Sequence, residues 1–182
     1  MARALAHVGA EVRVARSAVE TGHPDRVVLP GVGHFGQVAE ALRERGFDGL
    51  VAAHVAAGRP FLGVCVGLQT LLDSSEEAPG VAGLGLIPGR VVRFDAPKVP
   101  QVGYNLVEPV REGVVARAYY YFVNSYHAVP ADPSVVAAVS DYQGAFVAAV
   151  AVGSVLAVQF HPEKSGPVGL ELLTRWLGGQ RC

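Results

Sequence analysis

The chain has few cysteines and an almost balanced charge, and both features limit the classes of protein to which it can belong. Cys65 and Cys182 are the only cysteines among 182 residues. Two cysteines cannot form a disulfide framework, and their spacing is not that of metal ligands. We therefore expect no metal or other cofactor, and a reducing, cytoplasmic setting. The formal net charge of −1 gives no electrostatic basis for binding nucleic acid or an anionic membrane.

Long apolar runs are also missing. No run approaches the roughly 18 residues that a membrane span needs, and the N-terminus lacks the charged and apolar regions of an export signal. We therefore expect a soluble protein without a membrane span. The length of 182 residues suits a single domain over residues 1–182, which would bury roughly 70% of its unfolded surface. Small molecules and protein partners remain as candidate ligands.

The first part of the chain alternates between helical and strand patterns. Residues 1–9 have the pattern of the last turns of a helix that Gly9 ends, and residues 21–25 are rich in turn formers. Strands are predicted at 11–15, 26–29 and 61–64, and helices at 37–45 and 48–57. This alternation predicts an α/β fold with a mixed, mostly parallel central sheet flanked by helices. Ligands of such sheets bind at the carboxyl ends of the strands.

The second part of the chain is rich in short strands. Apolar runs separated by Pro, Gly and Asp predict strands at 90–94, 101–107, 119–126, 135–140, 145–152 and 155–159. We expect them to form a smaller antiparallel region, followed by a closing helix at 168–177. The acidic, glycine-rich segment 73–86 is predicted to be a solvated surface loop outside any site.

Cys65 lies between Gly63 and Gly67 where a predicted strand gives way to a helical pattern. A free cysteine is most often a small buried hydrophobe, and that interpretation competes here with a nucleophile. The G-x-C-x-G spacing favours a nucleophile elbow, whose tight turn is strained by roughly 1–3 kcal/mol and accommodates only small neighbours. The start of a helix is expected to lower the thiol pKa.

The segment 30–36, P-G-V-G-H-F-G, follows another predicted strand. It could be a flexible connection, or a loop whose backbone N–H groups turn toward a developing negative charge. It lacks the spacing and the lysine of a phosphate-binding loop. An oxyanion hole therefore fits it better than a nucleotide site.

A cysteine nucleophile needs a base, and His161 is the best candidate. It follows the last predicted strand in the sequence H-P-E, and Pro162 disfavours helical geometry at His161. His161 then lies at the same sheet edge as Cys65 if their strands are parallel, and Glu163 can orient the imidazole. A coincidental turn is the alternative. His127 is a weaker candidate, at the end of a tyrosine-rich run that is more typical of a core.

These motifs together resemble class I, triad-type glutamine amidotransferases, and more narrowly the glutaminase subunits of imidazole glycerol phosphate synthases. The resemblance extends over nearly the whole chain and rests on the following segments: L-P-G-V-G-H-F-G at 29–36, P-F-L-G-V-C-V-G-L-Q at 60–69, S-E-E-A-P-G at 75–80, G-L-G-L-I-P-G at 83–89, V-P-Q-V-G-Y-N at 99–105, Y-F-V-N-S-Y at 121–126 and Q-F-H-P-E-K-S-G at 159–166. The cysteine and H-P-E motifs are common to the class. The P-G-V-G loop, the G-Y-N segment and E-K-S-G point to the narrower group.

The resemblance implies a role for each site residue. Cys65 attacks the glutamine carboxamide, His161 transfers the proton from the thiol to the departing ammonia, and Glu163 holds the histidine. Backbone N–H groups of Val66 and of the Val32–Gly33 region stabilise the oxyanion. The implied substrate-binding residues are Gln69, Ser125 and Tyr126, together with Gly33.

The resemblance also implies a partner, a cyclase subunit with a (β/α)₈ barrel that forms a heterodimer with this chain and receives the ammonia. The residues implied to face it are Pro100, Gln101, Tyr104, Asn105 and Lys164. We expect low glutaminase activity without this partner, because the oxyanion loop would rest with its N–H turned away.

Two features depart from the family pattern. Family members usually open with a strand and the turn I-x-D-Y-G-x-G-N, whereas this sequence starts later, so we expect the first strand to be missing and a misplaced start codon to be the cause. Tyr104 also stands where tryptophan is common. Two alternatives stay open: the glutaminase of another biosynthetic amidotransferase, and a non-catalytic assembly subunit that has lost the first strand.

Overall fold

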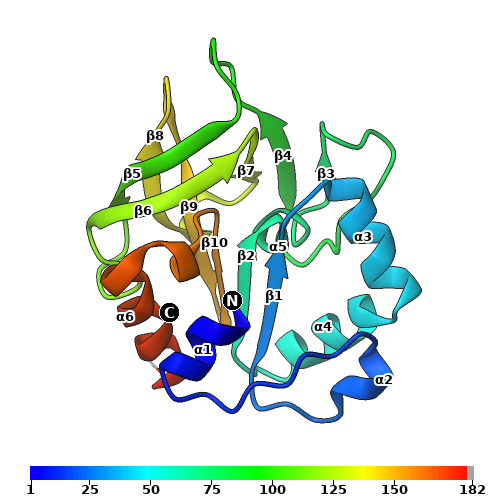
Figure 1. The fold of residues 1–182 in the computed structure, drawn as a ribbon. Coiled ribbons are helices and arrows are strands. Elements are labelled where there is room, and N and C mark those ends of the chain that lie inside the picture. The colour runs from blue at the N-terminus through cyan, green and yellow to red at the C-terminus, as the bar shows by residue number, and fades with distance from the viewer. Residues whose placement is uncertain (180–182) are drawn as a thin grey trace.

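The structure is a computed structural model that describes residues 1–179, so Cys182 lies outside the described residues. Figure 1 shows helices packed on both faces of a mixed sheet. The helices are α1 (Ala2–His7), α2 (Ala18–Thr21), α3 (Phe35–Glu44), α4 (Phe47–Ala56), α5 (Val66–Gln69) and α6 (Gly166–Leu177), with short 3₁₀ turns η1 (Pro133–Val135) and η2 (Pro162–Lys164). The strands are β1 (Val27–Gly31), β2 (Phe61–Cys65), β3 (Ser74–Ser75), β4 (Gly89–Arg93), β5 (Gln101–Pro109), β6 (Ala118–Asn124), β7 (Tyr126–Pro130), β8 (Val136–Asp141), β9 (Ala145–Val152) and β10 (Val155–Val158).

The sheet combines a parallel centre with an antiparallel extension. Its strand order is β1-β2-β10-β9-β7-β4-β3, while β8 pairs with β9 and β5, and β5 carries β6. In the described part of the chain, parallel pairing is confined to β1–β2, β2–β10 and the short pair β3–β4. The predicted α/β class with a mixed sheet is therefore confirmed. The expectation that the sheet is mostly parallel is wrong, because strands β5 to β9 pair only in antiparallel fashion.

Strands β2 and β10 form the centre of the core. Every residue of both strands is buried, because helices cover the sheet on both sides (Figure 1). On one side, Leu62 and Val64 belong to the same apolar cluster as Trp176 of α6. On the other side, Phe61 packs in a cluster with Phe35 of α3. This two-sided burial explains the continuous apolar pattern of these strands.

Most predicted elements lie where expected. The tyrosine-rich run, which we expected to be part of the core, is buried in part. Tyr120 and Phe122 are fully buried, whereas the side chain of Tyr119 is 62% exposed. The run also divides into two strands, β6 and β7, with a break at Ser125.

The prediction of a strand at 11–15 is wrong. These residues form neither helix nor strand, and Val14 is 76% exposed. Alternation produces a strand only where a neighbouring strand offers free backbone groups. Segment 11–15 does not pair with such a strand: within residues 1–179, β1 pairs with β2 alone, and its outer side is not hydrogen-bonded to this segment. Helix α2 was also not anticipated.

None of the helices within residues 1–179 combines the length and the apolar character needed to cross a membrane.

Candidate active site

Cys65 occupies a sharp turn between β2 and α5, as the elbow motif predicts. Its backbone φ is 55° and ψ is −111°, a conformation that non-glycine residues rarely adopt. A Cβ on Gly67 would lie 2.0 Å from the carbonyl oxygen of Leu29. A Cβ on Gly63 would lie 2.9 Å from the carbonyl oxygen of Gly67. The predicted strain and the need for small neighbours are therefore both confirmed.

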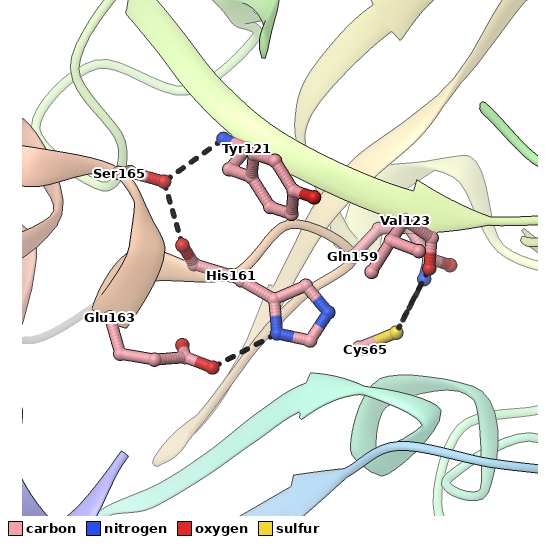
Figure 2. A network of polar contacts seen from close by, with 7 residues as sticks. All are labelled: Cys65, Tyr121, Val123, Gln159, His161, Glu163 and Ser165. Atoms are coloured by element: carbon pink, nitrogen blue, oxygen red, sulfur yellow. Dashed lines mark hydrogen bonds and ion pairs between the residues drawn. The ribbon is translucent and has the colours of Figure 1, made fainter. Parts of the chain in front are cut away.

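The sheet brings His161 to Cys65. Strand β10 runs parallel to β2, with Val158 opposite Val64. The residues that follow the two strands therefore leave the sheet at the same end. Cys65 and His161 line one cavity of about 340 Å³. In Figure 2 the imidazole lies between Glu163 and Cys65, with Nε2 on the side of the sulfur. The predicted convergence at one sheet edge is confirmed.

Glu163 fixes the orientation of the His161 ring. The ring Nδ1 lies 3.0 Å from Glu163 Oε1. Burial of Glu163, the largest single influence, raises the pKa of its carboxyl group. The hydrogen bond from His161, a backbone hydrogen bond and the positive charges of His161 and the N-terminus together outweigh burial, and the net pKa is lowered. The ionised carboxylate therefore accepts from Nδ1–H, which leaves Nε2 on the side of the sulfur. Within the described residues, Nε2 is buried and has no hydrogen-bond partner.

The backbone around His161 is held by Ser165. The Ser165 hydroxyl donates to the carbonyl of His161 (2.7 Å) and accepts from the N–H of Tyr121 (3.0 Å), as Figure 2 shows. The N–H of His161 in turn donates to the carbonyl of Tyr121 (2.8 Å). The sequence analysis did not assign a role to Ser165, although it is part of the E-K-S-G segment.

The thiol of Cys65 is neutral in the resting structure. Burial raises its pKa to about 11, with smaller contributions from the carboxylates of Glu163 and Glu77. Hydrogen bonds from the Val66 N–H and from Gln159 act in the opposite direction. The expectation of a lowered thiol pKa is wrong here, because α5 is only four residues long and burial outweighs its dipole.

The loop predicted as an oxyanion hole borders the same cavity. Val32 and Gly33 line it opposite Val66, and Gly33 has a φ of 123°. His34 caps α3 by accepting from the N–H of Gly36 (3.1 Å). The loop is therefore anchored at its downstream end, where α3 begins.

Glu77 was missed by the sequence analysis. Its carboxylate accepts from the N–H of Phe35 (2.7 Å), and the residue lines the cavity. The expectation that segment 73–86 is a solvated loop outside the site is thus wrong at Glu77. The only signal was its place in S-E-E-A-P-G, which the resemblance included without a role.

The predicted substrate residues Gln69, Ser125 and Tyr126 all line the cavity. The side-chain amide of Gln69 donates to the carbonyl of Tyr126 (3.0 Å) and to Gln159 Oε1 (3.1 Å). Both of its N–H bonds are thereby used. Its own carbonyl oxygen is the group that Gln69 can offer to a ligand.

The predicted interface residues have different surroundings. Tyr104 is 60% exposed, and its hydroxyl donates to the carbonyl of Lys164 (2.8 Å). Pro100 lines the cavity, whereas Gln101 is only 3% exposed. Asn105 donates to the carbonyl of Asp141 (2.6 Å).

His127, the weaker candidate for the base, lies outside the cavity, and no metal-binding cluster is found in the described residues. His127 stacks on Phe94 with ring centroids 4.8 Å apart and does not line the cavity. Across residues 1–179, no three His, Cys, Asp or Glu side chains are grouped so that they could hold a metal ion.

A strained cysteine elbow, a histidine just after the neighbouring parallel strand and an orienting glutamate form the constellation of a thiol-dependent amidotransferase. The family model described as glutamine amidotransferase class-I matches residues 1–177, and the chain belongs to this family. Its fold is similar to a solved structure described as a glutamine amidotransferase, with a TM-score of 0.78 at 23% identity over 97% of this chain and 91% of the other.

Within this class, the sequence is similar to proteins named imidazole glycerol phosphate synthase subunit HisH. The relative from Deinococcus radiodurans is 50% identical over 96% of this chain and 85% of its own length. The relative from Thermus thermophilus is 47% identical over 94% of this chain and 87% of its own length. The relative from Chlorobaculum tepidum is 41% identical over 94% of this chain and 89% of its own length.

Proposed function

We propose that this chain is the glutaminase subunit of an imidazole glycerol phosphate synthase in histidine biosynthesis. It hydrolyses glutamine to glutamate and ammonia with Cys65, His161 and Glu163. The observation that carries the proposal is the shared cavity of Cys65 and His161, in which the buried Nε2 has no other described partner. The similarity to HisH subunits gives the biosynthetic setting.

The geometry supports a covalent mechanism. His161 Nε2 takes the thiol proton, and the sulfur attacks the carboxamide carbon of glutamine. The N–H of Val66 and an N–H from the Val32–Gly33 loop stabilise the oxyanion, each worth about 10²–10³ in rate. His161 then gives its proton to the leaving nitrogen, and ammonia departs. Water, deprotonated by His161, hydrolyses the thioester to glutamate and restores the thiol.

The cavity is suited to an α-amino acid. Its volume of about 340 Å³ lies within the usual range for small-molecule sites. The free carbonyl oxygen of Gln69 and the carboxylate of Glu77 are acceptors for the ammonium group of glutamine. Ser125 and Tyr126, at the break between β6 and β7, complete the proposed substrate site.

The proposed partner is a cyclase with a (β/α)₈ barrel, bound as a heterodimer in the cytoplasm. Ammonia would join an activated ribulosyl phosphate there, giving imidazole glycerol phosphate and an aminoimidazole carboxamide ribotide. An apolar face beside the cavity supports this docking: Val102 and Tyr104 of β5 and Tyr119 of β6 are each at least 60% exposed. The other residues proposed for the interface lie nearby. Gln101 and Asn105 belong to β5, the carbonyl of Lys164 accepts from Tyr104, and Pro100 lines the cavity.

The test is glutamate release from glutamine by the full chain together with the cyclase. The Cys65→Ser variant is expected to lose activity by at least about 10³-fold, because an alcohol is a far weaker nucleophile here than a thiol. Thermal unfolding of the same variant serves as the control for folding. Equal glutamate release by both proteins would overturn the proposed mechanism.

The two alternatives have separate tests. If the chain serves another biosynthetic amidotransferase, a different synthase will copurify with it. If it is a non-catalytic assembly subunit, a diazo-ketone analogue of glutamine will leave Cys65 unlabelled.

A further inference from the structure

Gln159 is a buried polar residue beside the nucleophile to which the proposed mechanism assigns no role. It follows β10 directly, and its side chain is 0% exposed. Its backbone N–H donates to the carbonyl of Ala148 in β9 (2.8 Å), which fixes the direction of the side chain. A fully buried amide is costly unless both of its ends are hydrogen-bonded.

Both ends of this amide contact residues of the site. Gln159 Nε2 donates to Cys65 Sγ (3.6 Å), and Gln159 Oε1 accepts from the side chain of Gln69 (3.1 Å). Figure 2 shows the amide nitrogen above the sulfur and on the opposite side from Glu163. The sulfur therefore has a donor on one side and the His161 ring on another.

We propose that Gln159 is a positioning residue that acts on two groups at once, holding the Cys65 sulfur and orienting Gln69. The donor stabilises the negative charge that develops on sulfur when His161 takes the proton. The acceptor occupies one N–H of Gln69 and so keeps the Gln69 carbonyl oxygen toward the cavity.

The electrostatics of the site explain why a hydrogen-bond donor from Gln159 to the sulfur is needed. Burial and two nearby carboxylates oppose thiolate formation at Cys65. The Val66 N–H counteracts them in the resting structure, but in the reaction it is also required for the oxyanion. Gln159 contacts no oxyanion position, so its donation to sulfur does not compete with that task.

The test compares alkylation of Cys65 by iodoacetamide in the full chain and in the Gln159→Met variant, which conserves volume but removes the donor. Loss of a hydrogen bond to the thiolate is expected to slow alkylation about 10- to 100-fold at each pH between about 7 and 9. If Gln159 merely fills space, the rate will not fall, because methionine conserves the volume and any loosening of the core would expose the thiol. An unchanged or faster rate in Gln159→Met overturns the proposal.

A second variant separates the two contacts. Gln159→Glu keeps an acceptor for Gln69 but replaces the donor to sulfur by a carboxylate. We expect kcat for glutamine hydrolysis to fall by at least about tenfold with KM within about twofold of the unmodified chain. In Gln159→Met, KM also rises, since Gln69 loses its acceptor. If KM changes equally in both variants, the assignment to Gln69 is wrong.

Ser140→Ala is the matched control, because Ser140 is also buried and donates to Leu106 (2.7 Å) away from the cavity. It should lower thermal stability without changing alkylation or KM. The inference rests on Cys65 as the nucleophile of the proposed function. If complete labelling of Cys65 leaves glutaminase activity intact, the proposed function fails. If labelling of Cys65 inactivates the enzyme but the Gln159→Met substitution does not slow this labelling, the proposed function stands and only the role of Gln159 fails.

Discussion

Cys65 holds its proton until substrate arrives, and this distinguishes it from nucleophilic cysteines that rest as thiolates. Burial raises its pKa to about 11, and the neighbouring Nε2 of His161 is buried with no hydrogen-bond partner among residues 1–179. Charge separation is therefore left to the substrate complex, where the amide nitrogen and the oxyanion donors complete the site. A neutral thiol is also a slower target for adventitious oxidation and alkylation.

The pH dependence of Cys65 alkylation follows directly. Below a pKa of about 11, the thiolate fraction of the resting chain rises about tenfold per pH unit. The rate with iodoacetamide, followed by mass spectrometry of the peptide that contains Cys65, is expected to rise in this proportion between about pH 7 and pH 9. A plateau below neutral pH would show a preformed thiolate and contradict this expectation.

The raised pKa of Cys65 also makes the stability of the folded chain depend on pH. The folded chain keeps the Cys65 proton more tightly than the unfolded chain, whose thiol has the ordinary pKa of about 9.0. The contribution of this group to the free energy of unfolding is therefore fully present below about pH 9 and falls as pH rises toward the folded pKa.

At the scale of elements, the elbow depends on Gly67 and on two glycines that contact it, Gly31 and Gly63. A Cβ on Gly31 of β1 would lie 2.5 Å from the N of Gly67, and a Cβ on Gly67 would lie 2.0 Å from the carbonyl of Leu29. Gly63 of β2 faces Gly67 in the same way. Because the backbones of β1, β2 and α5 touch here, no side chain fits between the start of α5 and the sheet.

The Gly67→Ala variant tests this contact. Its methyl group would overlap backbone atoms that cannot turn aside, so we expect a loss of about 3 kcal/mol in the free energy of unfolding, measured by urea denaturation. The matched control is Gly49→Ala in α4, where a Cβ meets nothing within 4 Å. That variant should gain about 0.5–1 kcal/mol from helix propensity. Equal effects of the two substitutions would contradict the packing argument.

At the scale of the whole molecule, the exposed side chains of β5 and β6 connect the cavity to the proposed partner. Tyr104 lies on this face and donates to the backbone carbonyl of Lys164, and Lys164 directly follows Glu163 in η2. The ammonium of Lys164 also lies 5.4 Å from the centre of the Tyr121 ring. A partner that presses on Tyr104 therefore acts on a side chain that is hydrogen-bonded to the segment that carries His161 and Glu163.

We expect Tyr104→Ala to weaken binding of the cyclase by about tenfold or more, since exposed tyrosines at the centre of an interface are frequent hot spots. Val19→Ala is the control, because Val19 is 95% exposed on α2, away from β5 (Figure 1). Titration calorimetry measures both. Glutaminase activity of the lone chain should also be low, and Tyr104→Ala should reduce its stimulation by the cyclase. Unaltered binding by Tyr104→Ala would remove this residue from the interface.

Sequence patterns predicted the parts of the molecule that local chemistry determines. The elbow at Cys65, the strand before it and the H-P-E segment follow from glycine spacing, apolar runs and proline. The thiol pKa was not predictable, because it depends on burial by the whole fold. Gln159 and Glu77 were missed for a related reason: each meets the site only through contacts with residues far along the chain. The failed strand at 11–15 shows the same limit, since pairing requires a partner.

The position of β10 has a consequence for biosynthesis. This strand lies between β2 and β9 in the sheet, although the ribosome makes it after both of them. A nascent chain that has emerged only to β9 already contains Cys65 but has neither His161 nor strand β10, which precedes it. Glutamine cleavage must therefore wait for the final segment to insert, and an interrupted polypeptide cannot release ammonia into the cell.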